Sequence, residues 1–203
     1  MSRTAEPEPL LRLARNGNED ALGRLLELYG RYLALLARVQ IGQRLQGKVD
    51  PADLVQETFL EAHRSFSRFQ GTSEGQFLQW LRQILANRLA TLLRHYLGTK
   101  RRDVRLEHEI ADELDRSTMG LGHALRAPQS SPSQQASRRE QAVLLADALS
   151  SLPDDYREAI VLRQMEGLTF PQVAERMSRS VDSVEKLWLR GVAQLRRLLE
   201  ESP

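Results

Sequence analysis

Apolar residues recur at spacings of three and four along most of the chain, which is the pattern of amphipathic helices. Asn18 or Asp20 is a candidate cap for the second of these helices, and Asp50-Pro51 supplies a cap and a first-turn proline for the third. Gly42–Val49 interrupts the pattern between them. Alternating strand patterns are almost absent, so the fold is predicted to be all-α. The helices predicted in the N-terminal half span about 8–15, 20–39, 51–66 and 76–97, with a loop over 69–75.

Residues 152–197 contain a second group of predicted helices. Pro153 and the two acids after it open a short helix, and Gly167 ends it. Thr169 caps the next helix, and Ser180 caps a longer one whose apolar residues recur at three and four. A short helix, a tight turn and a capped second helix form the arrangement that places a helix N-terminus in the DNA major groove. A plain helical hairpin is the alternative interpretation of this stretch.

The composition changes between about residues 98 and 137, where acids are followed by glycine, proline and serine. Such a segment is too poor in apolar residues to build a core. We therefore expect domains over 8–102 and 138–200, joined by a flexible linker over 103–137. The acids of this linker are Asp103, Glu107, Glu109, Asp112, Glu113 and Asp115.

The composition excludes several kinds of site. The chain has 203 residues, a net charge of +2 and no cysteine, which rules out disulfides and thiolate metal sites. His108-Glu109 begins a motif similar to a helical metal site, but Asp112 replaces the second histidine and a third ligand is missing, so no metal is expected. We find no nucleophile–base pair and no phosphate loop, and expect neither an enzyme nor a cofactor. Without a signal peptide or a long apolar run, a cytoplasmic protein without membrane insertion is expected.

Two predicted helices have polar faces suited to binding. On the third helix, Asp53, Gln56 and Glu57 share one exposed face, which suits docking against a basic protein surface. An ordinary solvated face is the alternative, and composition alone favours it. The fourth helix and its C-terminal flank hold six bases and one acid over 74–102, and bases with amides on one face fit contacts to phosphates and base edges. Trp80 is expected in the core, although it could stack on an unpaired base.

The order of several motifs resembles one known family. DLVQETFL (53–60), Phe69-x-Gly71, FLQWLRQILANRL (77–89), a linker and GLTFPQVAERM (167–177) before a capped helix are similar to the extracytoplasmic-function group of the sigma-70 family. Members of this family are bacterial RNA polymerase specificity subunits with two helical domains, sigma-2 and sigma-4. The resemblance covers about residues 8–102 and 138–200.

The resemblance implies a role for each polar face. The third helix would dock on the clamp helices of the polymerase core through Asp53, Gln56 and Glu57. The −10 promoter element would be bound by Phe69, Gln70, Gly71, Thr72, Arg82, Asn87, Arg88 and Arg94. The −35 element would be bound by Ser180, Asp182, Ser183, Lys186 and Arg190. The acidic linker would pass near the active-site cleft of the polymerase. For Phe69, packing beneath the loop is an equally good interpretation.

The chain departs from the family pattern at two places. Thr91 stands where the family often has Asp, and Asp182 and Glu185 stand where many members have a base. These departures leave the promoter sequence open. Two other functions are also weighed: a free-standing helix-turn-helix regulator, which would be a dimer on a palindromic site, and an adaptor that binds proteins alone. Separate basic helices in two tethered domains favour a sigma factor that is a monomer when free. It would bind polymerase core and promoter DNA, and an anti-sigma factor is a further candidate partner.

Overall fold

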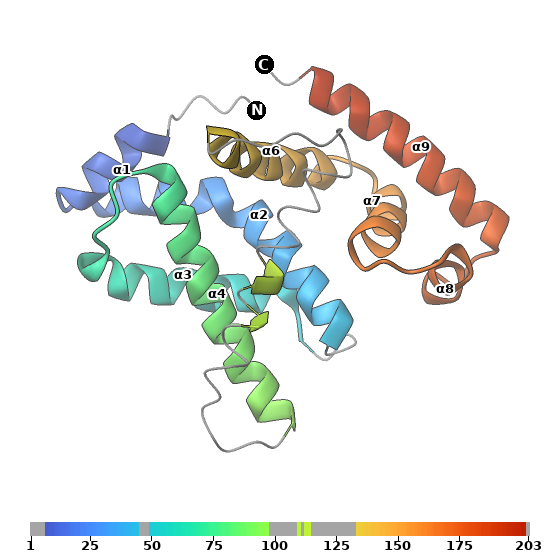
Figure 1. The fold of residues 1–203 in the computed structure, drawn as a ribbon, viewed down its shortest axis with the longest axis horizontal. Coiled ribbons are helices and arrows are strands. Elements are labelled where there is room, and N and C mark those ends of the chain that lie inside the picture. The colour runs from blue at the N-terminus through green and yellow to red at the C-terminus, as the bar shows by residue number, and fades with distance from the viewer. Residues whose placement is uncertain (1–6, 45–48, 98–108, 111, 115–132, 202–203) are drawn as a thin grey trace. The chain divides into compact units, whose positions relative to one another are not determined.

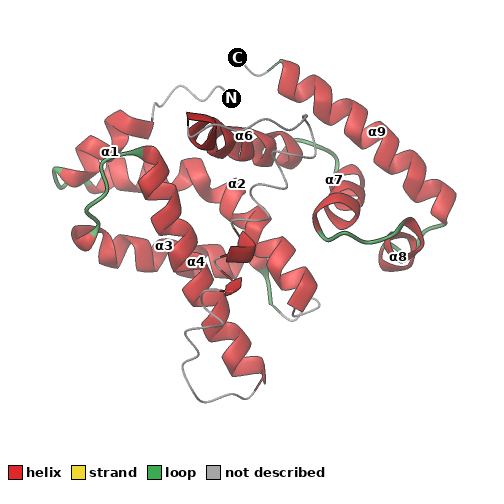
Figure 2. Cartoon of the chain, in the orientation of Figure 1, coloured by secondary structure: helices red, strands yellow, loops and turns green. Residues whose placement is uncertain are grey.

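In the computed structural model, residues 7–44, 49–97, 109–110, 112–114 and 133–201 are described. Every element in these ranges is a helix, which confirms the all-α prediction (Figures 1 and 2). The chain divides into two compact units, Met1–Arg116 and Ser117–Pro203. The predicted domain limits of 8–102 and 138–200 stay predictions.

The first unit is built from α1 (Pro7–Arg15), α2 (Glu19–Arg44), α3 (Pro51–Ser65), the 3₁₀ turn η1 (Phe66–Arg68) and α4 (Glu74–Leu97). Helix α2 packs against α1, α3 and α4, and α3 also packs against α4. Local capping defines two of the helix starts. Asn18 Oδ1 accepts a hydrogen bond from Ala21 N at 2.8 Å, and Asp50 Oδ1 accepts one from Ala52 N at 2.8 Å. Asn18 is therefore the cap of the second helix.

Helix α2 continues beyond its predicted end near Val39, through Gly42 to Arg44. Glycine in a helix interior costs about 1 kcal/mol relative to alanine. Val39 and Ile41 are 0% and 2% exposed, so burial of the flanking apolar side chains offsets this cost. The break predicted at Gly42 was wrong because tertiary packing overrides local propensity.

Ten residues of the predicted linker are in helical conformation. Residues 133–137 begin the helix that follows the linker, and the other five are Glu109–Ile110 and Asp112–Leu114, of which Ile110 and Leu114 are fully buried. The prediction of a structureless linker was wrong here, because the two apolar residues are four positions apart and share one helical face. The other acids of the linker and His108 lie outside the described residues.

The second unit contains α6 (Ser133–Ser150), α7 (Asp154–Ile160), the π-helical turn η2 (Val161–Met165), α8 (Phe170–Arg176) and α9 (Val181–Glu200). Helix α6 begins before the predicted restart at Arg138. Helix α9 packs against α6, α7 and α8. It packs tightly on α7 at Gly191, where an added Cβ would lie 3.0 Å from Ile160 Cδ1 and 3.1 Å from Tyr156 Cβ.

Candidate nucleic-acid interface

Helix α3 presents an exposed polar face with one apolar side chain at its C-terminal end. Asp53, Gln56 and Glu57 are all exposed, as the sequence predicts. Leu60 follows Glu57 by three positions on the same face and is 57% exposed. We call these four residues the α3 face. Sequence reasoning missed Leu60, although its spacing from Asp53 and Glu57 would have placed it there.

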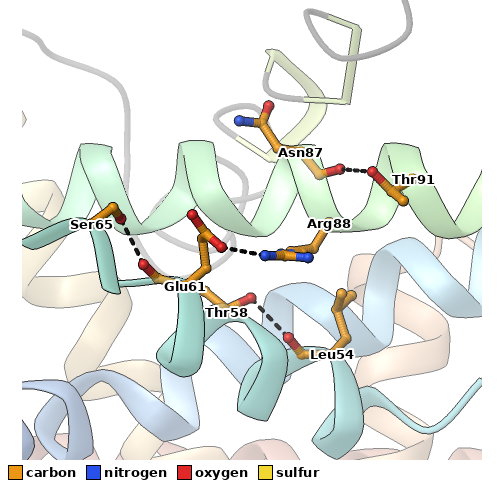
Figure 3. A network of polar contacts seen from close by, with 7 residues as sticks. All are labelled: Leu54, Thr58, Glu61, Ser65, Asn87, Arg88 and Thr91. Atoms are coloured by element: carbon orange, nitrogen blue, oxygen red, sulfur yellow. Dashed lines mark hydrogen bonds and ion pairs between the residues drawn. The ribbon is translucent and has the colours of Figure 1, made fainter. Parts of the chain in front are cut away.

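The opposite side of α3 holds the helix in the core. Leu54 is 1% exposed, and Thr58 is fully buried and donates its hydroxyl hydrogen to the Leu54 carbonyl oxygen at 2.8 Å (Figure 3). Because the buried Thr58 hydroxyl has its partner within the helix, it carries no penalty for an unsatisfied polar group. The α3 face is therefore displayed by a helix that is fixed from behind.

The loop predicted over 69–75 is shorter in the structure, because α4 begins at Glu74 and residues 69–73 join it to η1. We keep the name 69–75 loop for these five residues and the first two of α4. Side chains of α4 and α2 hold this segment. Gln76 Oε1 accepts hydrogen bonds from Thr72 N at 2.7 Å and Ser73 N at 3.3 Å. From α2, the buried Tyr29 hydroxyl donates to Glu74 Oε1 at 2.8 Å. Surface loops are generally more mobile than the helices they connect. These hydrogen bonds therefore fix the backbone of a short polar loop.

Four aromatic side chains form a cluster beneath this loop. Phe69 is stacked on Phe66 at a centroid distance of 5.9 Å and 24°, and lies 5.7 Å from Phe77 and 4.9 Å from Trp80. A Cβ added to Gly71 would lie 2.2 Å from Phe69 Cζ, so the loop backbone rests on that ring. Phe69 is half-buried, which favours its interpretation as a support beneath the loop. Trp80, expected in the core, is half-buried at the edge of the cluster.

A cavity of about 440 Å³ opens beside Trp80, between α3 and α4. It brings together Asn87 and Arg88, two residues predicted to bind the −10 element, with Arg68, which the prediction omitted. Arg68 is exposed in η1, and its closeness to α4 could not be read from local sequence pattern. The lining residues are Glu61, Ser65, Arg68, Trp80, Ile84, Asn87, Arg88 and Thr91.

Arg88 is tied to α3 by an ion pair. Its Nη2 contacts Glu61 Oε2, and each side chain is 33% exposed (Figure 3). At this exposure solvent screens the pair, so its contribution to stability is small. Its main consequence is geometric, because Figure 3 shows the Arg88 guanidinium directed at Glu61 and the Asn87 amide directed away from it.

A row of linked polar side chains follows the accessible side of α4. Gln83 Nε2 donates to Asn87 Oδ1 at 3.1 Å, and Thr91 Oγ1 donates to the Asn87 carbonyl oxygen at 2.9 Å. Arg94 Nη2 donates to Thr91 Oγ1 at 2.8 Å. We call these four residues the α4 row. Amide and guanidinium groups in this order match the contacts that proteins make to base edges and phosphates.

Arg82 does not belong to this row. It was predicted to lie outside the core, but its side chain is buried at 7% exposure and its Nη1 lies 3.5 Å from Tyr32 Oη. Helix α4 contacts α1, α2 and α3, so its buried arc is wider than a single apolar stripe. Arg82 falls within this arc, four residues after the buried Leu78. Its expected position outside the core was therefore wrong, and its assignment to the −10 element stays a prediction.

The second unit has the predicted helix-turn-helix geometry. Gly167, with φ of +73°, ends the first segment in the conformation that favours glycine. Thr169 caps α8, and Gln172 Oε1 accepts from Thr169 N at 2.8 Å. Ser180 Oγ accepts from Ser183 N at 3.2 Å and so caps α9. A small core of Leu162, Val173, Ala174 and Val184 fixes α8 against α9.

The N-terminal turns of α9 expose the predicted −35 side chains. Asp182, Lys186 and Arg190 are exposed, whereas Val184 is fully buried on the opposite side. Lys186 Nζ lies 2.7 Å from Asp182 Oδ2, so the acid that departs from the family pattern is paired one helical turn later. Ser180 is exposed and Ser183 is half-buried.

Comparison with known proteins identifies both units. Residues 28–97 match sigma-70 region 2, and residues 142–195 match sigma-70 region 4. The ECF RNA polymerase sigma factor BldN of Streptomyces coelicolor is 31% identical over 201 residues, covering 98% of this chain and 68% of BldN. The ECF RNA polymerase sigma-E factor of Haemophilus influenzae is 28% identical over 191 residues, covering 94% of each chain. Among solved structures, a chain in the structure of CnrH in complex with the cytosolic domain of CnrY is 28% identical to this chain. The match covers 97% of this chain and 98% of that chain, with a TM-score of 0.37.

Regions 2 and 4 on separate helical units define the class of protein as a sigma factor, which directs transcription initiation. Within that class, the chain belongs to the extracytoplasmic-function group of the sigma-70 family. In the part of the chain that the structure describes, no helix has the length and apolarity needed to cross a membrane. Across the same residues, no three His, Asp or Glu side chains are grouped so as to hold a metal ion.

Proposed function

We propose that this sigma factor binds the polymerase core through the α3 face and contacts promoter DNA through two separate surfaces. The observation that supports this most strongly is that each region matched to the family displays an exposed polar surface on a helix packed from behind. Two acids and an amide beside an exposed leucine suit a protein interface that combines an apolar contact with polar ones. The clamp helices of the core are the partner that the family resemblance implies.

The −10 element is proposed to be bound by the first unit, through the α4 row and the 69–75 loop. Asn87 and Arg94 are positioned for base edges and phosphates. Gln70 and Thr72 are exposed on the loop, and Gly71 allows close approach of its backbone to DNA. Arg88 is a more restricted contributor, because it would have to keep or exchange its Glu61 partner on binding.

The −35 element is proposed to be bound by α9. A capped helix N-terminus offers unpaired backbone N–H groups to a phosphate, and the first two turns offer side chains to base edges. Asp182 is able to accept from a cytosine amino group, and Lys186 neutralises it when DNA is absent. Ser180, Ser183 and Arg190 complete this surface.

We further propose that the protein acts by binding, without catalysis, in the cytoplasm. It would be a monomer when free, since its two DNA surfaces lie in two units of one chain. An anti-sigma factor is a further candidate partner, by resemblance to the family.

Run-off transcription with purified bacterial core polymerase on a promoter library tests this proposal. We expect transcripts from a defined set of promoters when the protein is added, and a shared −10 and −35 sequence among them. Binding of a palindromic duplex by a dimer without polymerase, together with no change in transcript starts, would favour the free-standing regulator instead.

A further inference from the structure

One hydrogen bond joins the N-terminal helix to the 69–75 loop. Arg15 Nη1 donates to the Gly71 carbonyl oxygen at 3.1 Å, across 56 positions of sequence. Arg15 lies in the last turn of α1, which is anchored by the buried Leu11 and Ala14, at 2% and 5% exposure. The guanidinium therefore extends from a fixed helix to the middle of the loop.

The carbonyl that Arg15 contacts belongs to Gly71, which is already in contact with the aromatic cluster. Gly71 rests on the ring of Phe69, as the 2.2 Å approach of an added Cβ to Cζ shows. On either side of it, Gln70 and Thr72 are exposed and contribute little apolar burial. A charged donor makes a stronger hydrogen bond than a neutral one. The hydrogen bond from Arg15 therefore holds Gly71 in addition to its packing on the Phe69 ring.

We propose that Arg15 is a positioning residue that keeps the 69–75 loop in the conformation able to take up unpaired promoter DNA. A loop that is already ordered in the free protein loses less conformational entropy when it binds, so the capture of DNA becomes more favourable. The inference rests on the proposed function of the loop in binding the −10 element. It assigns to α1 the task of setting loop order, a role distinct from DNA contact.

Amide hydrogen exchange of the free full-length protein tests the structural half of this inference. Arg15→Ala should speed exchange of the Thr72 amide by about three- to tenfold, the scale of one exposed charge-assisted hydrogen bond. Arg15→Lys should restore part of the protection. Arg12→Ala removes an exposed arginine one turn earlier on α1 and serves as the matched control. Unchanged exchange in Arg15→Ala would overturn the inference, whatever the polymerase assays show.

Promoter opening by the reconstituted holoenzyme tests the functional half. Arg15→Ala should slow opening of duplex promoters by about three- to tenfold, with a smaller effect on a pre-melted promoter and no change in the salt dependence of binding. The logarithm of DNA affinity falls linearly with the logarithm of salt concentration. If Arg15→Ala reduces the magnitude of this slope by about one, Arg15 contacts a phosphate directly and the positioning role is overturned. Failure of the wild-type protein to open any promoter would instead contradict the proposed function and leave the exchange result standing.

Discussion

At the scale of single residues, two helical glycines show how helix propensity and packing oppose each other. Replacing a helical glycine by alanine gains about 1 kcal/mol when the site is open. Gly23 in α2 has no atom within 4 Å of an added Cβ. At Gly191 an added Cβ would meet the Tyr156 carbonyl oxygen at 3.3 Å and its Cβ at 3.1 Å, and neither atom can rotate away.

The two glycines are therefore predicted to respond in opposite directions. Gly23→Ala should stabilise the first unit by up to about 1 kcal/mol. Gly191→Ala should destabilise the second unit by about 1 kcal/mol, because overpacking typically costs about 1–3 kcal/mol and exceeds the gain in propensity. Hydrogen exchange of the most protected amides in each unit measures both changes separately. Equal stabilisation by both substitutions would show that α7 and α9 separate freely.

Arg82 shows how residue type can mislead an assignment. An arginine is usually exposed, which favoured a place outside the core. Arg82 nevertheless lies four positions after Leu78 and seven before Leu89, so helical spacing places it among the buried leucines of α4. Caps and turns behave differently, because Asp50, Thr169 and Ser180 act within their own segments, and each was predicted correctly.

At the scale of secondary-structure elements, α3 is expected to act as a rigid docking surface. Asp53→Arg with Glu57→Arg should abolish co-purification with polymerase core, because two reversed charges would face a basic surface. Helical content, measured by circular dichroism, should stay unchanged. Leu60→Ala should weaken core binding by about 1 kcal/mol or more, as the apolar centre of an interface does.

Glu27→Arg with Glu200→Arg carries the same change in net charge at exposed positions of two other helices, α2 and α9. This control should bind core normally. Core binding retained by the α3 double variant, or lost equally by the control, would contradict docking through α3.

Helix α9 makes a second prediction at this scale. Lys186→Ala and Arg190→Ala should each reduce transcription from promoters with a −35 element, with about 1–3 kcal/mol lost wherever a base contact is removed. Asp182→Ala frees Lys186 from its partner and should strengthen binding to all sequences while lowering discrimination among them.

Competition binding of the holoenzyme to promoter variants, each measured at several salt concentrations, separates these effects. Arg197→Ala, an exposed base near the C-terminal end of α9, is the control. If combined replacement of Asp182, Ser183 and Lys186 leaves promoter choice unchanged, another surface binds the −35 element.

At the scale of the whole molecule, the division of the chain into two helical units could be predicted from the order of motifs. Part of the binding surfaces could not be predicted in this way. The apolar periodicity gave the helices of both units, and the change in composition indicated that the chain divides in two. Arg68 at the cavity and the contact between Arg15 and Gly71 depend on packing between different elements. Leu60 was missed although its spacing from Glu57 places it on the α3 face. Ile110 and Leu114 were assigned to a linker because overall composition masked their spacing.

The measurement that tests the central claim most directly is permanganate reactivity of unpaired thymines in the −10 region. Core polymerase with this protein should make those thymines reactive on a duplex promoter, and core alone should not. Asn87→Ala should reduce opening of the duplex by roughly tenfold or more, if one base contact of about 1–3 kcal/mol is lost, and should affect a pre-melted promoter less. Equal defects of Asn87→Ala on the duplex and on the pre-melted promoter would contradict the account. So would thymines that stay unreactive on duplex promoters when core polymerase carries the wild-type protein.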